Sequence, residues 1–114
     1  MALSKEELLR YSRQLALPDI GPAGQAKLRA ARVAVVGAGG LGAPVLAYLA
    51  GAGVGEIGVF DYGEVELSNL HRQPLYTAAD VGTRKTEAAR RRLLEMNPGI
   101  KVNAAEGMLT PENM

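Results

Sequence analysis

The fold is decided by residues 32–42, which are Arg-Val-Ala-Val-Val-Gly-Ala-Gly-Gly-Leu-Gly. Residues 33–36 form a short apolar run without polar alternation, which predicts a parallel strand buried on both faces. The glycines that follow have the spacing Gly37-x-Gly39-x-x-Gly42, and the apolar residues 44–50 then predict a buried helix. A strand, a glycine turn and a helix in this order are typical of a nucleotide-binding unit.

Each glycine of this turn has its own expected role. Gly37 permits the tight turn, while Gly39 and Gly40 let backbone N–H groups approach a phosphate. Gly42 allows the helix to close on the strand. The alternative is an α/β turn without a ligand, and the residues that follow bear on that choice.

A second apolar run, residues 57–60, ends at Asp61. A carboxylate at this distance from the glycine turn can accept hydrogen bonds from ribose hydroxyls. Together the two runs predict an α/β fold with a Rossmann-like, doubly wound and mainly parallel sheet. A third strand is expected at residues 100–105.

Composition narrows the class of protein. The chain has 114 residues, of which 47% are hydrophobic, enough for one domain with a core. A formal net charge of +1 does not indicate a nucleic-acid or membrane partner. The chain contains no cysteine, which excludes disulfides and thiolate metal sites within these residues. The first residues lack the pattern of a signal peptide, so we expect a cytoplasmic protein.

Residues 1–31 are expected to form a helical arm that precedes the nucleotide-binding residues 32–114. Ser4 and Glu7 have the spacing of a capping box, and Pro18 is expected to end the helix that they open. A loop at residues 18–24 and a short helix at 25–31 would follow. Since the arm need not belong to the sheet, it could pack on a partner.

Polar side chains are dense in the loop Ser68-Asn69-Leu70-His71-Arg72-Gln73. Loops after strand ends line the ligand crevice of a doubly wound sheet, although a plain surface loop is the alternative. A helix is expected from about Arg84 to Met96, with Ala89, Leu93 and Met96 facing inward. Lys85 heads that inward stripe, which is unusual unless it meets an anion.

The cations expected at this crevice, Arg72 and Lys85, favour ATP over a dinucleotide. A triphosphate carries about four negative charges, and nearby cations offset the repulsion that weakens the approach of another anion. If ATP is bound for chemistry, a carboxylate could attack the α-phosphate and give an acyl-adenylate and pyrophosphate. An NAD-linked oxidoreductase fragment and a non-catalytic nucleotide-binding module are the alternatives.

A family resemblance rests on residues 10–14 (Arg-Tyr-Ser-Arg-Gln), the glycine turn, residues 52–55 (Ala-Gly-Val-Gly), Asp61 and residues 68–73. With these features the chain resembles the MoeB/ThiF group of ubiquitin-activating-like adenylyltransferases. It implies a homodimer that uses ATP and Mg²⁺ to adenylate the C-terminal glycine of a small ubiquitin-like sulfur carrier of the MoaD or ThiS type. Such carriers serve molybdenum cofactor or thiamine biosynthesis.

The resemblance also implies roles for individual residues. Gly40 and Asp61 would hold phosphate and ribose, residues 68–72 would line the nucleotide, and Lys85 would meet the phosphates. Arg13 would reach into the neighbouring subunit's site, although on its own it is typical of a solvated helix face. The candidate catalytic residues are therefore Arg13, Arg72 and Lys85, and the candidate nucleotide-binding residues are Gly37, Gly39, Gly40, Gly42, Asp61, Ser68, Asn69, Leu70, His71, Arg72, Gln73 and Lys85.

Residues 110–112, Thr-Pro-Glu, have the pattern of a helix start. We therefore expect the chain to be part of a longer enzyme and inactive alone. The family's magnesium-binding aspartate, its CxxC zinc site and the cysteine of some members would lie beyond Met114, so no metal ligand is assigned here.

Overall fold

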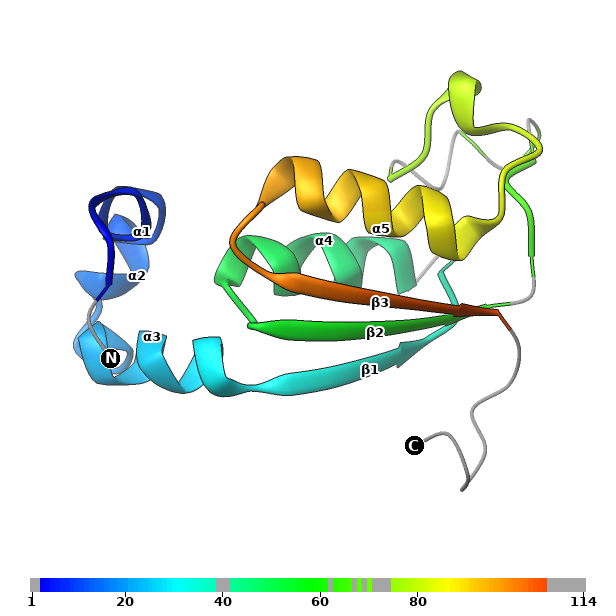
Figure 1. Cartoon of the computed structure of the whole chain (residues 1–114). Coiled ribbons are helices and arrows are strands. Elements are labelled where there is room, and N and C mark those ends of the chain that lie inside the picture. Colours follow the sequence, from blue (N-terminus) through cyan, green and yellow to red (C-terminus); the bar gives the residue numbers. More distant parts are fainter. Residues whose placement is uncertain are drawn as a thin grey trace.

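A parallel three-stranded sheet with the order β1-β2-β3 forms the centre of the fold (Figure 1). The computed structural model describes residues 3–38, 42–61, 63–66, 68, 70 and 75–106. The strands are β1 (Arg32–Val36), β2 (Glu56–Asp61) and β3 (Lys101–Glu106). They confirm the α/β class and the parallel sheet predicted from the sequence.

Two long helices connect the strands and cover one face of the sheet (Figure 1). Helix α4 (Gly42–Ala52) joins β1 to β2, and α5 (Lys85–Met96) follows the short 3-10 helix η2 (Ala78–Asp80) and leads to β3. The core lies between helices and sheet, and its largest wholly buried apolar side chains are Leu46, Ile57, Val59, Val65 and Leu93.

The predicted burial of the first strand on both faces is wrong for this chain. Val33 and Val35 point toward the helices and are half-buried, whereas Ala34 and Val36 are exposed, Val36 by 62%. The reason is that α4 and α5 lie on the same side of the sheet. Among the described residues, no helix covers the opposite face.

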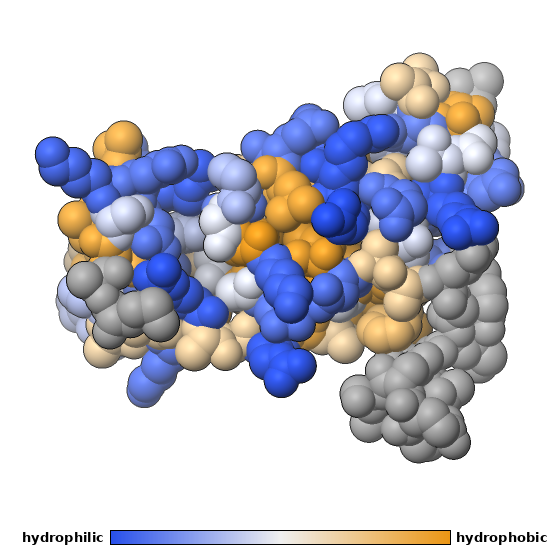
Figure 2. Space-filling view, viewed as in Figure 1, coloured by the Kyte–Doolittle hydropathy of each residue, from blue (hydrophilic) through white to orange (hydrophobic). Residues whose placement is uncertain are grey.

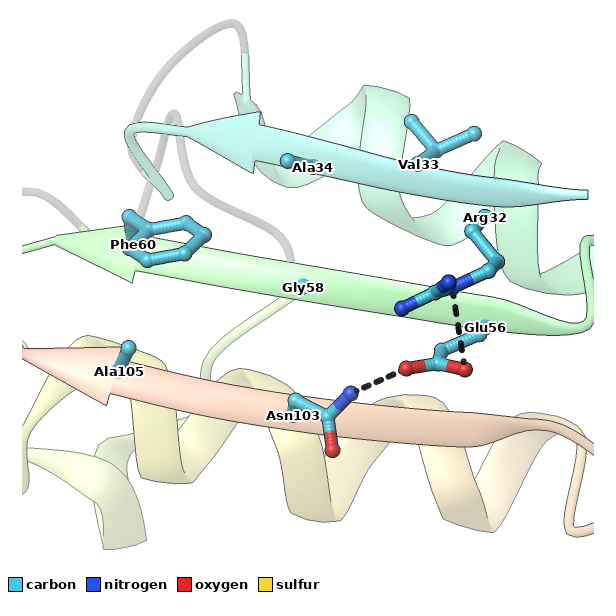
Figure 3. Close-up of a pocket in the computed structure, with 8 residues that line it drawn as sticks. All are labelled: Arg32, Val33, Ala34, Glu56, Gly58, Phe60, Asn103 and Ala105. Atoms are coloured by element: carbon cyan, nitrogen blue, oxygen red, sulfur yellow. Dashed lines mark hydrogen bonds and ion pairs between the residues drawn. The ribbon is translucent and has the colours of Figure 1, made fainter. Parts of the chain in front are cut away.

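That uncovered face carries a shallow groove of about 500 Å³ that runs across all three strands (Figure 3). At one end, Glu56 accepts a hydrogen bond of 2.8 Å from Asn103 and lies 3.6 Å from the Arg32 guanidinium. At the other end lie Phe60 and Ala105. None of the eight labelled residues belongs to the predicted nucleotide site.

The N-terminal arm contains three helices, α1 (Lys5–Arg10), α2 (Ser12–Leu15) and α3 (Gly21–Ala30). The capping box is confirmed, since Ser4 and Glu7 each accept a hydrogen bond from the other's backbone N–H. The first helix is broken at Tyr11, which the sequence did not predict. Tyr11 has φ −103° and ψ 16°, and its side chain turns inward to become 95% buried, with an exposed fraction of 5%.

The third helix begins at Gly21, four residues earlier than predicted. Pro22 lies in its first turn, where the missing N–H removes no helical hydrogen bond. The prolines and glycines of residues 18–24 therefore start a helix instead of forming only a loop. Helix α3 then leads directly into β1 (Figure 1).

The arm packs on the C-terminal ends of α4 and α5 through polar side chains that are buried or half-buried. Gln14 and Gln25 both donate hydrogen bonds to the Ala52 carbonyl, at 3.1 and 3.0 Å. Asn97, which is 2% exposed, donates to the Tyr11 hydroxyl oxygen and to the Ala50 carbonyl. The arm is thus docked on its own chain at the end where the strands begin (Figure 1).

The inward stripe of α5 ends one turn earlier than predicted. Ala89 and Leu93 are completely buried, but Met96 is 36% exposed. Asn97 takes the inward position at this end of the helix, where its amide donates to the Ala50 carbonyl. The Met96 carbonyl accepts a hydrogen bond from the Arg10 guanidinium. Figure 2 shows polar side chains around an apolar patch that lies where Figure 1 places α5 and the start of β3.

Within the described part of the chain, no helix is long and apolar enough to cross a membrane.

Candidate active site

The glycine turn begins where β1 ends, and its first and last glycines are required by geometry. Gly37 has φ +93°, and its N–H donates to the Phe60 carbonyl at 2.7 Å. A Cβ atom at Gly42 would overlap the carbonyl oxygen of Gly37. The predicted tight turn at Gly37 and the predicted close approach of helix to strand at Gly42 are therefore confirmed.

Asp61, at the end of β2, holds this turn in place. Its Oδ2 accepts a hydrogen bond of 2.8 Å from the backbone N–H of Ala38, and its Oδ1 accepts one of 2.5 Å from that of Gly63. The side chain is only half-buried. Each oxygen has a second lone pair, so the carboxylate can still accept hydrogen bonds from a ligand.

Tyr76 contacts the same residue of the turn and was not identified from the sequence. Its hydroxyl donates a hydrogen bond of 2.5 Å to the Ala38 carbonyl, and the side chain is 4% exposed. Burial, with a smaller effect of the Asp61 carboxylate, raises the pKa of Tyr76. The hydroxyl therefore remains a hydrogen-bond donor at neutral pH.

Lys85 is brought beside Asp61 by pairing between two distant segments. Glu64 and Arg84 form an antiparallel bridge, and the Lys85 N–H donates to the Gly63 carbonyl at 2.9 Å. A Cβ atom at Gly63 would lie 3.0 Å from Asp61 Oδ1 and 3.4 Å from Lys85 Cδ. The carboxylate and the lysine stem thus flank the same glycine.

The segment that leads into α5 is fixed by a buried carboxylate. Asp80, 3% exposed, accepts a hydrogen bond of 2.8 Å from the Thr77 N–H and pairs with the Arg91 guanidinium. This contact joins η2 to the second turn of α5. It helps to keep the start of α5, and therefore Lys85, in a defined position.

Comparison with known proteins identifies the family. Residues 11–114 match the ThiF family. The chain belongs to the ThiF family. This confirms the resemblance drawn from the glycine turn, Asp61 and residues 68–73.

The sequence relatives within this family include named adenylyltransferases. The chain is 56% identical over 113 residues to the sulfur carrier protein adenylyltransferase of Thermus thermophilus, covering 99% of this chain and 42% of the relative. It is 54% identical to the probable adenylyltransferase/sulfurtransferase MoeZ of Mycobacterium tuberculosis, covering 98% of this chain and 29% of the relative. The chain thus spans less than half the length of either relative.

Solved structures of other proteins have a similar fold. E. coli tRNA N6-threonylcarbamoyladenosine dehydratase, TcdA, in complex with ATP has a TM-score of 0.89 and 28% identity, covering 99% of this chain and 46% of that chain. E. coli MccB with ATP has a TM-score of 0.78 and 41% identity, covering 89% of this chain and 31% of that chain. Both of these neighbours were therefore solved with ATP.

Only part of the predicted ThiF-family loop lies in the described residues. Ser68 is exposed, whereas Leu70 is half-buried and packs against the apolar core. The other predicted site residues of the loop and the turn lie outside the described residues: Gly39, Gly40, Asn69, His71, Arg72 and Gln73.

Arg13 is not brought to this site within one chain. It lies on α2 and is exposed, at the end of the molecule where the strands begin, whereas the glycine turn and Asp61 lie where the strands end (Figure 1). The structure therefore places Arg13 away from the glycine turn and Asp61 of its own chain.

Among the residues that the structure describes, no group of three or more His, Asp or Glu side chains could hold a metal ion. Asp61 offers one carboxylate at the site, and its two oxygens accept the N–H groups of Ala38 and Gly63. No magnesium or zinc ligand is assigned to these residues.

Proposed function

We propose that the enzyme containing this chain uses ATP to adenylate the C-terminal glycine carboxylate of a small ubiquitin-like sulfur-carrier protein of the MoaD or ThiS type. The carrier would serve molybdenum cofactor or thiamine biosynthesis. The single observation that carries the proposal is the grouping of Asp61, the glycine turn and Lys85 at one edge of the sheet. Family membership and the name of the 56% identical relative support it.

The proposed reaction is a nucleotidyl transfer. A carboxylate oxygen of the carrier attacks the α-phosphorus of ATP, and the bond from that phosphorus to the bridging oxygen of the β-phosphate breaks. The products are the acyl-adenylate and pyrophosphate, so no oxidant or reductant is needed. Catalysis of this step consists mainly of positioning and charge stabilisation. ATP is taken as its magnesium complex, and none of the described residues is given a role in holding that ion.

Different residues of the chain would bind different parts of the nucleotide. Asp61 would accept hydrogen bonds from the ribose, and the amides of the glycine turn, including Gly39 and Gly40, would bind phosphate. Lys85 would place its ammonium group near the phosphates, because its stem lies beside Gly63 and Asp61. Arg72 and its neighbours Ser68, Asn69, Leu70, His71 and Gln73 would line the nucleotide.

The proposal includes a homodimer in which Arg13 acts in trans. The exposed side chain on α2 would enter the partner's site and stabilise charge on the phosphates, as an arginine finger does. Exposed apolar residues of the arm, Leu8, Leu9 and Leu17, provide surface for such a contact.

Carrier-dependent exchange of labelled pyrophosphate into ATP tests the proposed function, using the complete protein with a MoaD-type or a ThiS-type carrier. We expect exchange only when a carrier with an intact C-terminal glycine is present. A non-catalytic nucleotide-binding module would give no exchange with any carrier. Tighter binding of NAD than of ATP in calorimetry would instead indicate an oxidoreductase.

Mixed dimers test the shared site. We expect Arg13→Ala and Lys85→Ala homodimers to lose exchange, and a mixture of the two to regain part of it. One site of each mixed dimer would then hold both native residues. A fully active Arg13→Ala homodimer would remove Arg13 from the mechanism.

A further inference from the structure

One residue of the glycine turn is held at both of its backbone polar groups by side chains from a single segment. Ala38 is completely buried. Its N–H donates to Asp61 Oδ2 at 2.8 Å, and its carbonyl accepts from the Tyr76 hydroxyl at 2.5 Å. Asp61 and Tyr76 are the two ends of residues 61–76, the segment that contains the polar loop.

The Tyr76 hydroxyl is not needed for packing alone. The ring belongs to the apolar core, where phenylalanine would fill nearly the same volume. Burying a hydroxyl costs free energy unless it makes a hydrogen bond. The Tyr76 hydroxyl makes one by donating to the Ala38 carbonyl. Burial also raises the pKa of Tyr76, so the group donates a hydrogen bond at any physiological pH.

We propose that Tyr76 is a positioning residue for the nucleotide, whose hydroxyl orients the glycine turn toward the phosphates and ties it to the end of the polar loop. The inference rests on the proposed function, because it takes the glycine turn as the phosphate site. Tyr76 acts through Ala38 and does not touch the ligand.

The physical basis is the planarity of the peptide group. A hydrogen bond to the Ala38 carbonyl restrains rotation of the peptide plane to which that carbonyl belongs. Without the hydroxyl, the buried Ala38 carbonyl loses this hydrogen bond. Rotating the peptide plane toward another donor then becomes energetically favourable. Asp61 still accepts a hydrogen bond from the Ala38 N–H, so the substitution removes only the hydrogen bond to the Ala38 carbonyl.

Calorimetry on Tyr76→Phe in the complete protein tests the proposal, with ATP and adenosine as the two ligands. We expect the Kd for ATP to rise about tenfold, the usual size of one lost buried hydrogen bond. The Kd for adenosine, which has no phosphate to meet the turn, should change less than about twofold. A merely structural role would weaken both ligands equally.

Tyr48→Phe is the matched control, because Tyr48 lies on α4 and is 79% exposed. It should change neither affinity. Hydrogen exchange without ligand gives a second measurement: Tyr76→Phe should speed exchange of amides in residues 37–42 but not in β3. Unchanged exchange, or equal loss of ATP and adenosine, overturns the positioning role. If the unsubstituted protein binds no ATP, the proposed function fails, and exchange at the turn still decides whether Tyr76 orients it.

Discussion

Asn97 and Tyr11 are joined by a hydrogen bond of 2.7 Å from the amide nitrogen to the phenol oxygen, although 86 positions separate them in sequence. The same amide donates to the Ala50 carbonyl at 2.8 Å. Helices α4 and α5 therefore carry the arm at their C-terminal ends, while their N-terminal ends form the candidate nucleotide site. The arm that bears Arg13 is held against the same two helices that present Gly42 and Lys85.

Asn97→Leu should destabilise the chain, because it removes the hydrogen bonds that Asn97 Nδ2 donates to the Tyr11 hydroxyl and to the Ala50 carbonyl. Leaving a buried acceptor without its partner costs about 1–3 kcal/mol. Urea unfolding followed by circular dichroism measures the change. Asn103→Leu is the matched control, since Asn103 is exposed and its side chain donates a hydrogen bond to Glu56 at the surface of the sheet. Equal effects of the two substitutions would contradict a special role for Asn97.

Gly42→Ala and Gly51→Ala should have opposite effects, although both glycines lie in α4. A Cβ atom at Gly42 would overlap the Gly37 carbonyl, so the turn must open and ATP binding should be lost. At Gly51 the new Cβ would meet no described atom within 4 Å beyond its chain neighbours and the backbone of its own helix, and alanine should stabilise the helix by about 0.5–1 kcal/mol. Thermal unfolding and ATP calorimetry on both variants check this pair. ATP binding by Gly42→Ala at native affinity would contradict the prediction.

Lys85→Gln should slow pyrophosphate exchange by an amount corresponding to about 2–4 kcal/mol, because an aligned cation near the phosphates is lost. Stability should change little, since glutamine keeps most of the stem that packs beside Gly63. Lys27→Gln, an exposed substitution on α3, serves as the control. Normal exchange by Lys85→Gln would show that this lysine does not meet the phosphates.

Acid should weaken the first helix of the arm through Glu7. The Ser4 backbone N–H, with smaller help from the Ser4 hydroxyl and Arg29, holds the pKa of Glu7 below its ordinary value of 4.5. Because the pKa of Glu7 is lower in the folded state, its ionised carboxylate contributes to stability above the ordinary pKa. This contribution is lost as pH falls through the folded-state pKa. Far-ultraviolet dichroism from neutral pH to about pH 3 should show a smaller loss of helix in Glu7→Gln than in the native chain. Identical acid profiles would contradict a contribution from this capping box.

High pH should lower the free energy of unfolding through Tyr76. Its pKa is raised above the ordinary value of 10.0, so its contribution to stability is complete below that pH and is lost as pH rises further. The free energy of unfolding should therefore fall above about pH 10, and less so in Tyr76→Phe. Tyr48→Phe, at an exposed position, should keep the native slope. An unchanged slope in Tyr76→Phe would contradict the prediction.

Local chemistry made much of the fold and part of the site predictable. The capping box of Ser4 and Glu7 depends on residues three positions apart, and Gly37 is placed by a backbone φ of +93° that other residues rarely adopt. The strand, turn and helix around Gly42 follow from the same short stretch of residues. For these features the sequence carries the physical cause itself.

Short-range patterns were thus enough to predict the parallel α/β class, the glycine turn, the position of Asp61 and the family. Other features depend on the assembled fold: Tyr11 breaks the first helix, and Asn97 takes the inward position expected for Met96. The described helices leave one face of β1 uncovered, and the Tyr76 hydroxyl binds the Ala38 carbonyl. A strand or a glycine turn is specified by neighbouring residues, whose spacing and conformational limits are visible in the chain. The partner of a buried hydroxyl or amide is specified by which distant segments meet, and that depends on the packing of the whole molecule.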